Sequence, residues 1–141
     1  EIAETRPILL LDGAHNPAAA RVVASYLGQF RRVHPAARVI AIIGMMRDKD
    51  QTGFFQELAP VCDEFMVTEP SLPRAASVDE LAASLHQPEA VTHRVPLPAD
   101  ALARARRLAA PEDLICVTGS LMLVGEVKAL LRGCGLSPIR G

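Results

Sequence analysis

A carboxylate, an imidazole and an amide lie close together near the start of this chain, at Asp12, His15 and Asn16. The apolar run before them, residues 8–11, is typical of a buried strand, and Asn16 followed by Pro17 is typical of a helix start. Open α/β sheets bind ligands at the carboxyl ends of their strands. The pattern therefore predicts a ligand site, in which Asp12 accepts hydrogen bonds from ribose hydroxyls. The alternative is that Asp12 only caps its own turn.

The residues around this acid have separate expected roles. Gly13 predicts a sharp turn that lets a ligand approach the backbone closely, and Asn16 predicts mainly a helix cap. His15 lies one residue before the cap, where the positive end of the helix disfavours the imidazolium form, so we expect a neutral ring that makes one hydrogen bond. Free backbone N–H groups at such a helix start also bind phosphate or carboxylate.

Two further groups of polar residues follow predicted strands. Gly119 and Ser120 come after the segment 114–118, and we expect Ser120 to cap the last helix and to offer its hydroxyl group to a ligand. Lys49 lies in the charged loop 48–50, where we expect it to neutralise a phosphate or a substrate carboxylate. For these loop charges, solvation and capping remain the alternative.

The rest of the chain alternates short β-rich segments with helical patterns. The predicted strands are residues 8–11, 38–43, 64–68, 91–95 and 114–118, with an edge strand over residues 1–4. The predicted helices are residues 17–33, 51–59, 77–86, 101–109 and 121–131, and the tail from residue 133 is expected to be frayed. This order predicts a Rossmann-like three-layer α/β/α fold, with a mostly parallel sheet of about six strands and helices on both faces.

In the first predicted helix the apolar residues recur at helical spacing: Val22, Val23, Tyr26, Leu27, Phe30 and Val33. The next strong local signal is the capping box that Ser77 and Glu80 form at the start of the third helix.

The composition fits one compact domain, since half of the 141 residues are hydrophobic. The formal net charge of −1 predicts no nucleic-acid partner. The longest apolar runs are far short of the roughly 20 residues that a membrane span needs. Three cysteines without Cys-x-x-Cys spacing, together with the lack of a signal peptide, predict a cytoplasmic protein, and Cys116 is expected to be a small buried hydrophobe. The remaining histidines, His34, His86 and His93, have no paired ligand spacing, so we predict no metal site.

Three segments together resemble one known family. Residues 12–17 resemble the Asp-Gly-Ala-His-Asn-Pro signature of folylpolyglutamate synthases and dihydrofolate synthases, which are members of the Mur ligase superfamily. Residues 44–50 resemble the Gly-x-x-x-Asp-Lys-Asp loop of that family, and residues 117–121 resemble its Thr-Gly-Ser-Leu turn. The segments occur in the family's order, each at the end of a predicted strand, and the resemblance covers essentially the whole chain.

The resemblance implies an ATP-dependent carboxylate–amine ligase that joins L-glutamate to a folate, or to dihydropteroate, through an acyl phosphate. The residues that it implies for nucleotide binding are Asp12, Gly13, His15, Asn16 and Lys49. The residues that it implies for catalysis, near the glutamate, are His15 and Ser120.

No Gly-x-x-x-x-Gly-Lys-Ser/Thr phosphate loop occurs in these residues. In the family this loop and the bound Mg²⁺ belong to an N-terminal ATP-binding domain. The resemblance therefore implies that residues 1–141 are the C-terminal domain alone, inactive without its N-terminal domain and part of a monomeric enzyme.

Three other readings of the sequence are possible. The first is a free-standing α/β ligand-binding module without catalysis, and the second is the C-terminal domain of a peptidoglycan-type Mur ligase. A nucleotide-dependent oxidoreductase or methyltransferase is disfavoured, because Gly13 stands alone without the Gly-x-Gly-x-x-Gly pattern.

Overall fold

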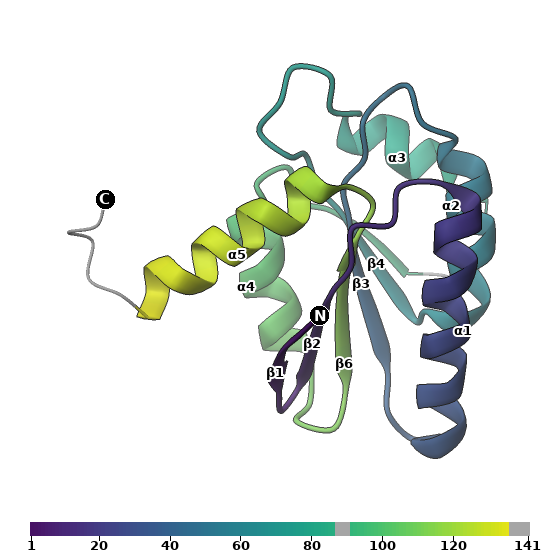
Figure 1. Ribbon diagram of the computed structural model, residues 1–141, viewed down its shortest axis with the longest axis vertical. Coiled ribbons are helices and arrows are strands. Elements are labelled where there is room, and N and C mark those ends of the chain that lie inside the picture. Colours follow the sequence, from purple (N-terminus) through teal and green to yellow (C-terminus); the bar gives the residue numbers. More distant parts are fainter. Residues whose placement is uncertain (87–90, 136–141) are drawn as a thin grey trace.

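The computed structural model describes residues 1–86 and 91–135, and within them six strands form one sheet. The strands are β1 (Ile2–Thr5), β2 (Ile8–Leu11), β3 (Val39–Ile43), β4 (Glu64–Val67), β5 (Val91–Arg94) and β6 (Leu114–Thr118). Their order across the sheet is β1-β2-β6-β3-β4-β5, and only the pairing of β1 with β2 is antiparallel (Figure 1). The predicted mostly parallel sheet with an edge strand at its start is confirmed.

Helices cover both faces of this sheet. They are α1 (Pro17–Val33), α2 (Gln51–Leu58), the short 3-10 helix η1 (Ala59–Val61), α3 (Val78–Ser84), α4 (Pro98–Leu108) and α5 (Leu121–Gly135). Helices α1, α2 and α3 lie on one face, whereas α4 and α5 lie on the other (Figure 1). The predicted three-layer α/β/α fold is therefore confirmed.

The two central strands explain why the core has two halves. All residues of β3 and β6 are buried, as expected of parallel strands that helices cover on both sides. Successive side chains of β3 point to opposite faces: Val39, Ala41 and Ile43 pack with α1, α2 and α3, whereas Ile40 and Ile42 pack with α4 and α5.

Several predicted helix ends were wrong by a few residues. Helix α4 begins at Pro98, three residues before the predicted start, because proline suits the first turn of a helix. Helix α3 ends at Ser84, and the 3-10 helix η1 extends the second helical segment through Pro60. Helix α5 continues to Gly135, so the fraying predicted from residue 133 is wrong for residues 133–135, and the rest of that prediction lies outside the described residues.

Three of the predicted strands are each one residue shorter than expected: β3, β4 and β5. The shortening of β3 has a clear cause. The backbone N–H of Arg38 donates to the Asp113 side chain at 2.8 Å, so this N–H is bonded to a loop carboxylate, and only the carbonyl of Arg38 pairs with β6, accepting from Leu114 at 3.0 Å.

The apolar residues of α1 divide between the core and the solvent. Val23, Leu27 and Phe30 are buried, but Val22 and Val33 are 71% and 70% exposed. Each residue advances about 100° around a helix, so the stripe that faces the sheet is narrow and the flanking apolar positions lie outside it.

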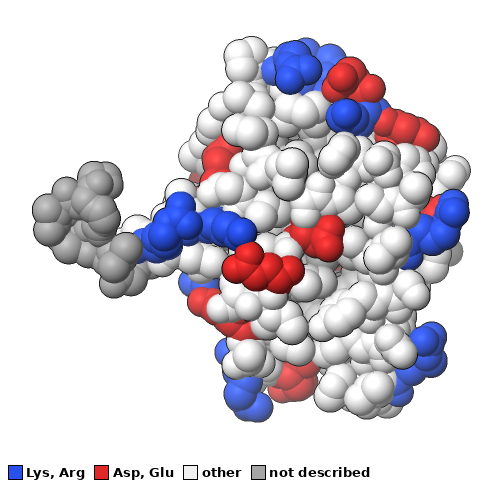
Figure 2. Space-filling model, in the orientation of Figure 1, with Lys and Arg blue, Asp and Glu red and all other residues white. Residues whose placement is uncertain are grey.

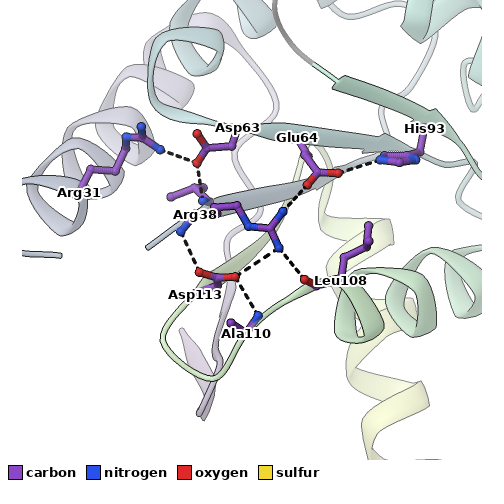
Figure 3. A network of polar contacts seen from close by, with 9 residues as sticks. Arg31, Arg38, Asp63, Glu64, His93, Leu108, Ala110 and Asp113 are labelled. Atoms are coloured by element: carbon purple, nitrogen blue, oxygen red, sulfur yellow. Dashed lines mark hydrogen bonds and ion pairs between the residues drawn. The ribbon is translucent and has the colours of Figure 1, made fainter. Parts of the chain in front are cut away.

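A network of polar side chains closes the amino-terminal edge of the sheet (Figure 3). The Arg38 guanidinium donates to Glu64 at 2.7 Å, and the other oxygen of Glu64 lies 2.8 Å from Nε2 of His93. Asp113, which is 3% exposed, also accepts from the backbone N–H of Ala110 at 2.8 Å. These bonds tie the starts of β3 and β4 to β5 and to the loop before β6, at the end of the sheet opposite the predicted site.

Two cysteines, Cys62 and Cys116, are free and buried. Burial raises the pKa of the Cys116 thiol to about 12 and that of Cys62 well above its usual value. Neither is a thiolate nucleophile at neutral pH, and Cys116 is the small buried hydrophobe that the sequence predicts.

Charges of both signs are interspersed on the face shown in Figure 2, and no broad area of that face carries a single sign. In residues 1–86 and 91–135, no helix is both long enough and apolar enough to span a membrane.

Candidate functional site

The loops that follow β2, β3 and β6 meet at the carboxyl edge of the sheet, at the top of Figure 1. Strand β6 lies between β2 and β3, yet the helix after β6 packs on the face opposite to α1 and α2. Chain connections therefore diverge at this point, and such switch points are where open α/β sheets bind ligands. The three motif segments of the sequence are these three loops.

A pocket of about 240 Å³ lies between the loops. Its lining residues are His15, Met46, Lys49, Gly119, Ser120, Leu121 and Met122. Pockets that enclose a whole small-molecule ligand usually measure roughly 300–1,000 Å³. The volume and the open shape of this pocket suit one wall of a larger site.

His15 is fixed by its own loop. Its Nδ1 lies 3.0 Å from the carbonyl oxygen of Gly13, and because a carbonyl can only accept, Nδ1 must carry the hydrogen. In the neutral ring Nε2 is then the nitrogen that accepts a hydrogen bond. The predicted single hydrogen bond is confirmed, and the half-buried imidazole lines the pocket.

Asp12, Gly13 and Asn16 belong to the same loop but do not line the pocket. A carboxylate oxygen of Asp12 accepts the backbone N–H of Ala14 at 2.9 Å, which is the turn-capping role given above as the alternative. A carboxylate has further acceptor positions, so this bond leaves a ribose contact possible. The Asn16 side chain accepts the backbone N–H of Ala19 at 2.8 Å, and the predicted helix cap is confirmed.

Gly13 and Gly119 both lie close to neighbouring atoms, but only at Gly119 is the nearest neighbour rigid backbone. A Cβ atom on Gly13 would overlap the side chain of Leu121. Gly119 has φ of +112°, and a Cβ there would lie 2.5 Å from the carbonyl oxygen of Gly44. The loops after β3 and β6 are thus in backbone contact beside the pocket.

Ser120 is buried and directly precedes α5. Its Oγ accepts the backbone N–H of Leu123 at 3.1 Å, so the predicted cap is confirmed. A hydroxyl that accepts one bond can still donate its own hydrogen to a ligand in the pocket.

Lys49 is exposed and belongs to a turn in which its backbone N–H donates to the carbonyl of Met46 at 3.2 Å. The neighbouring Asp50 caps α2, since its side chain accepts the backbone N–H of Gly53 at 2.9 Å. The charges of this loop therefore divide: Asp50 has a structural role, and Lys49 is a cation at the pocket.

The pocket also has an apolar rim, which is absent from the predicted site residues. Leu121 and Met122 are 69% and 45% exposed on the first turn of α5, and Met46 lines the pocket beside Lys49. No sequence signal separates these two from Leu123 and Val124, which follow in the same turn and are buried.

Within residues 1–86 and 91–135, no three His, Cys, Asp or Glu side chains are grouped closely enough to hold a metal ion.

Comparison with known families gives one match over most of the chain. Residues 1–121 match the family model "Mur ligase, glutamate ligase domain". A dihydrofolate synthase/folylpolyglutamate synthase of Haemophilus influenzae is 32% identical over 130 residues, which are 91% of this chain and 30% of the relative.

Two solved structures are similar in fold and sequence. E. coli FolC in complex with DHPP and ADP matches 96% of this chain with a TM-score of 0.85 and 29% identity. A bifunctional folylpolyglutamate synthase/dihydrofolate synthase with Mn, AMPPNP and L-glutamate bound matches 94% of it with a TM-score of 0.83 and 32% identity. The chain spans 31% and 30% of those two structures, respectively.

Proposed function

Because the chain belongs to the Mur ligase family, as its glutamate ligase domain, we propose that it serves an ATP-dependent ligase that adds L-glutamate to a folate or to dihydropteroate. The chain is homologous to the C-terminal domain of folylpolyglutamate/dihydrofolate synthases. In this proposal residues 1–141 form one domain of a monomeric enzyme, and a separate N-terminal domain carries the phosphate loop.

One observation carries the proposal: three family motifs, far apart in sequence, contribute side chains to one pocket. His15 comes from the loop after β2, Lys49 from the loop after β3, and Ser120 from the loop after β6. An imidazole, a cation and a hydroxyl are suitable groups for holding an amino acid or the phosphates of a nucleotide.

The roles follow from the chemistry of each group. The proposed nucleotide contacts are Asp12, Gly13, His15, Asn16 and Lys49, with Asp12 accepting from ribose hydroxyls and Lys49 neutralising a phosphate or carboxylate. The proposed catalytic residues are His15 and Ser120. Nε2 of His15 accepts a hydrogen bond from the incoming amine, and the hydroxyl of Ser120 donates one to a glutamate carboxylate.

The pocket fits part of a nucleotide better than it fits Mg²⁺. Mg²⁺ takes octahedral oxygen ligands, usually one or two carboxylates together with phosphates and water, and no carboxylate lines this pocket. We therefore assign Mg²⁺ to the N-terminal domain. When bound, ATP supplies the phosphoryl group that makes a carboxylate electrophilic.

The size and rim of the pocket support a site shared between two domains. An open pocket of about 240 Å³ needs a second surface to enclose its ligands. Leu121 and Met122 would be covered when the domains close, which would keep water from the activated carboxylate. We also propose the cytoplasm as the compartment, since Cys62 and Cys116 are free thiols.

The alternatives are a binding module without catalysis and a peptidoglycan-type Mur ligase. The names of the relatives favour the folate branch over the latter. If the chain is a binding module, the same ligand contacts are expected, but the full-length polypeptide should have no ligase activity. Ligase assays of the full-length polypeptide therefore separate this alternative from our proposal.

An amide NMR titration of this chain with ADP, and then with L-glutamate, tests the site. We expect shifts at residues 12–16 and 119–120, weakened in His15→Ala. The matched control is His34→Ala, which changes a histidine at the other end of α1 and should leave the shifts intact. Shifts elsewhere, or equal loss in both variants, would contradict the assignment.

The ligase proposal has a second, independent test. The full-length polypeptide should form the glutamyl amide with ATP, and Ser120→Ala should lower its turnover. Amide formation by the 141-residue chain alone would contradict the need for a second domain.

A further inference from the structure

We propose that Glu80 is a positioning residue for Lys49, and that helix α3 holds the loop 46–51 in the shape that places this lysine at the pocket. The inference rests on the proposed ligand role of Lys49. It assigns a part in the site to a helix that contributes no residue to the pocket lining.

The first contact is an ion pair between Arg47 and Glu80. The Arg47 Nε lies 3.2 Å from both carboxylate oxygens of Glu80, and Nη2 lies 3.1 Å from Oε1. Nη2 also donates to the carbonyl of Ala75 at 3.4 Å. A forked guanidinium contact of this kind fixes orientation as well as distance.

The second contact lies one helical turn further along α3. The hydroxyl of Ser84 lies 3.0 Å from the side-chain oxygen of Gln51 and 3.0 Å from the carbonyl oxygen of Glu80, so these two acceptors share its single hydrogen. The amide nitrogen of Gln51 donates to the carbonyl of Arg47 at 3.5 Å. Glu80 and Ser84 are four residues apart and so lie on one face of the helix. They hold the loop at Arg47 and Gln51, and Lys49 lies midway between these two residues.

Backbone hydrogen bonds connect these side-chain contacts to Lys49. The N–H of Arg47 donates to the carbonyl of Arg74 at 2.7 Å, and Lys49 closes a turn onto Met46 at 3.2 Å. Met46 in turn forms a bridge with Ala75, in the segment that leads into α3. A turn closed in this way has few free dihedral angles, so its orientation is set where Arg47 is held.

Glu80 also belongs to the capping box of α3, which determines how it can be tested. Its Oε1 accepts the backbone N–H of Ser77 at 2.9 Å. The bond from Arg47, followed by that from Ser77, lowers the pKa of Glu80 to about 2, so the carboxylate is charged at neutral pH. Glutamine can take the same place in a capping box, so Glu80→Gln keeps the cap but removes the charge that orients Arg47.

The test is a double-mutant cycle on the full-length ligase, measuring KM for ATP and for L-glutamate. Lys49→Ala identifies the substrate that Lys49 contacts. For that substrate we expect Glu80→Gln to raise KM by roughly threefold to fivefold, as for an exposed ion pair, with kcat nearly unchanged. In the Lys49→Ala background Glu80→Gln should have no further effect, because it acts through the lysine.

Two matched variants separate positioning from general damage to α3. Asp79→Asn makes the same chemical change at the adjacent position, where the side chain pairs with Arg94 at 2.6 Å, and should leave KM unchanged. Ser84→Ala removes the second contact and should raise the same KM as Glu80→Gln.

Amide NMR spectra of this chain give a readout that does not depend on activity. Glu80→Gln should shift the resonances of residues 46–51, and Asp79→Asn should not. The positioning role would be overturned if Glu80→Gln left the loop resonances or KM unchanged. It would also be overturned if Glu80→Gln had the same effect on KM with and without Lys49. If Lys49→Ala itself changes neither KM while the native enzyme is active, the role of Lys49 fails and this inference falls with it. An inactive native polypeptide would instead overturn the proposed function.

Discussion

The backbone N–H of Gly119 donates a hydrogen bond of 2.9 Å to the carbonyl oxygen of Ala14. This bond joins the loop after β2 to the loop after β6, although the two residues are far apart in the sequence. His15 and Ser120, which follow these residues directly, are thereby held on adjoining backbone. The candidate catalytic pair is therefore positioned by main-chain contacts.

Replacing Gly119 should test this junction. In Gly119→Ala the positive φ of +112° becomes strained, and the new Cβ meets the carbonyl oxygen of Gly44 at 2.5 Å. We expect the free energy of unfolding, measured in urea, to fall by roughly 1–3 kcal/mol. The control is Gly125→Ala in α5, where no atom lies within 4 Å of the added Cβ; it should be stabilising by roughly 0.5–1 kcal/mol. Equal effects of the two variants would contradict the contact.

The cap of α1 gives a second prediction. Asn16→Ala removes the acceptor for the N–H of Ala19 and should lower the free energy of unfolding by about 1 kcal/mol. Asn16→Ser keeps an acceptor, so its loss in the free energy of unfolding should be only a few tenths of the loss in Asn16→Ala. Thermal or urea unfolding of both variants measures the difference. Asn16→Ser keeps the cap but lacks the side-chain amide. If the shifts caused by ADP survive in Asn16→Ser, a nucleotide contact through this amide is wrong.

Asp113 should be a main support of the amino-terminal edge of the sheet (Figure 3). Asp113→Ala would leave the partly buried N–H groups of Arg38 and Ala110 without their acceptor. We expect a loss of roughly 2–3 kcal/mol in the free energy of unfolding. Glu112→Ala, at the exposed neighbouring position, should stay within about 0.5 kcal/mol of the native value. Ligand shifts at the opposite edge should persist in folded Asp113→Ala.

Acid titration should detect the pair of Arg47 and Glu80. The pKa of Glu80 is lowered from 4.5 to about 2, chiefly by the bond from Arg47. A lowered native pKa means that the pair is stabilising above pH 4.5, and that this stabilisation is lost as the pH falls through 4.5 towards 2. Carboxyl-carbon NMR should show a Glu80 midpoint near 2, and in Arg47→Ala the midpoint should return towards 4.5. An unchanged midpoint in Arg47→Ala would contradict the pair.

The local sequence was sufficient for the elements and their caps. The alternation of strands and helices, the edge strand, and the caps at Asn16 and Ser77 were readable because periodicity and capping depend on residues a few positions apart. Helix ends such as that of α3 were less readable, because tertiary contacts override weak local preferences near termini.

The sequence by itself determined which residue types follow each strand, and their resemblance to one family's motifs. Only the tertiary structure decided which of them meet. Strand β6 lies between β2 and β3, and this order brings His15, Lys49 and Ser120 to one pocket while leaving Asp12 and Asn16 outside its lining. The ion pair through which Glu80 positions the Lys49 loop could likewise not be predicted from the sequence. The physical reason is that strand order and side-chain pairing depend on contacts between distant segments, which no short-range pattern encodes.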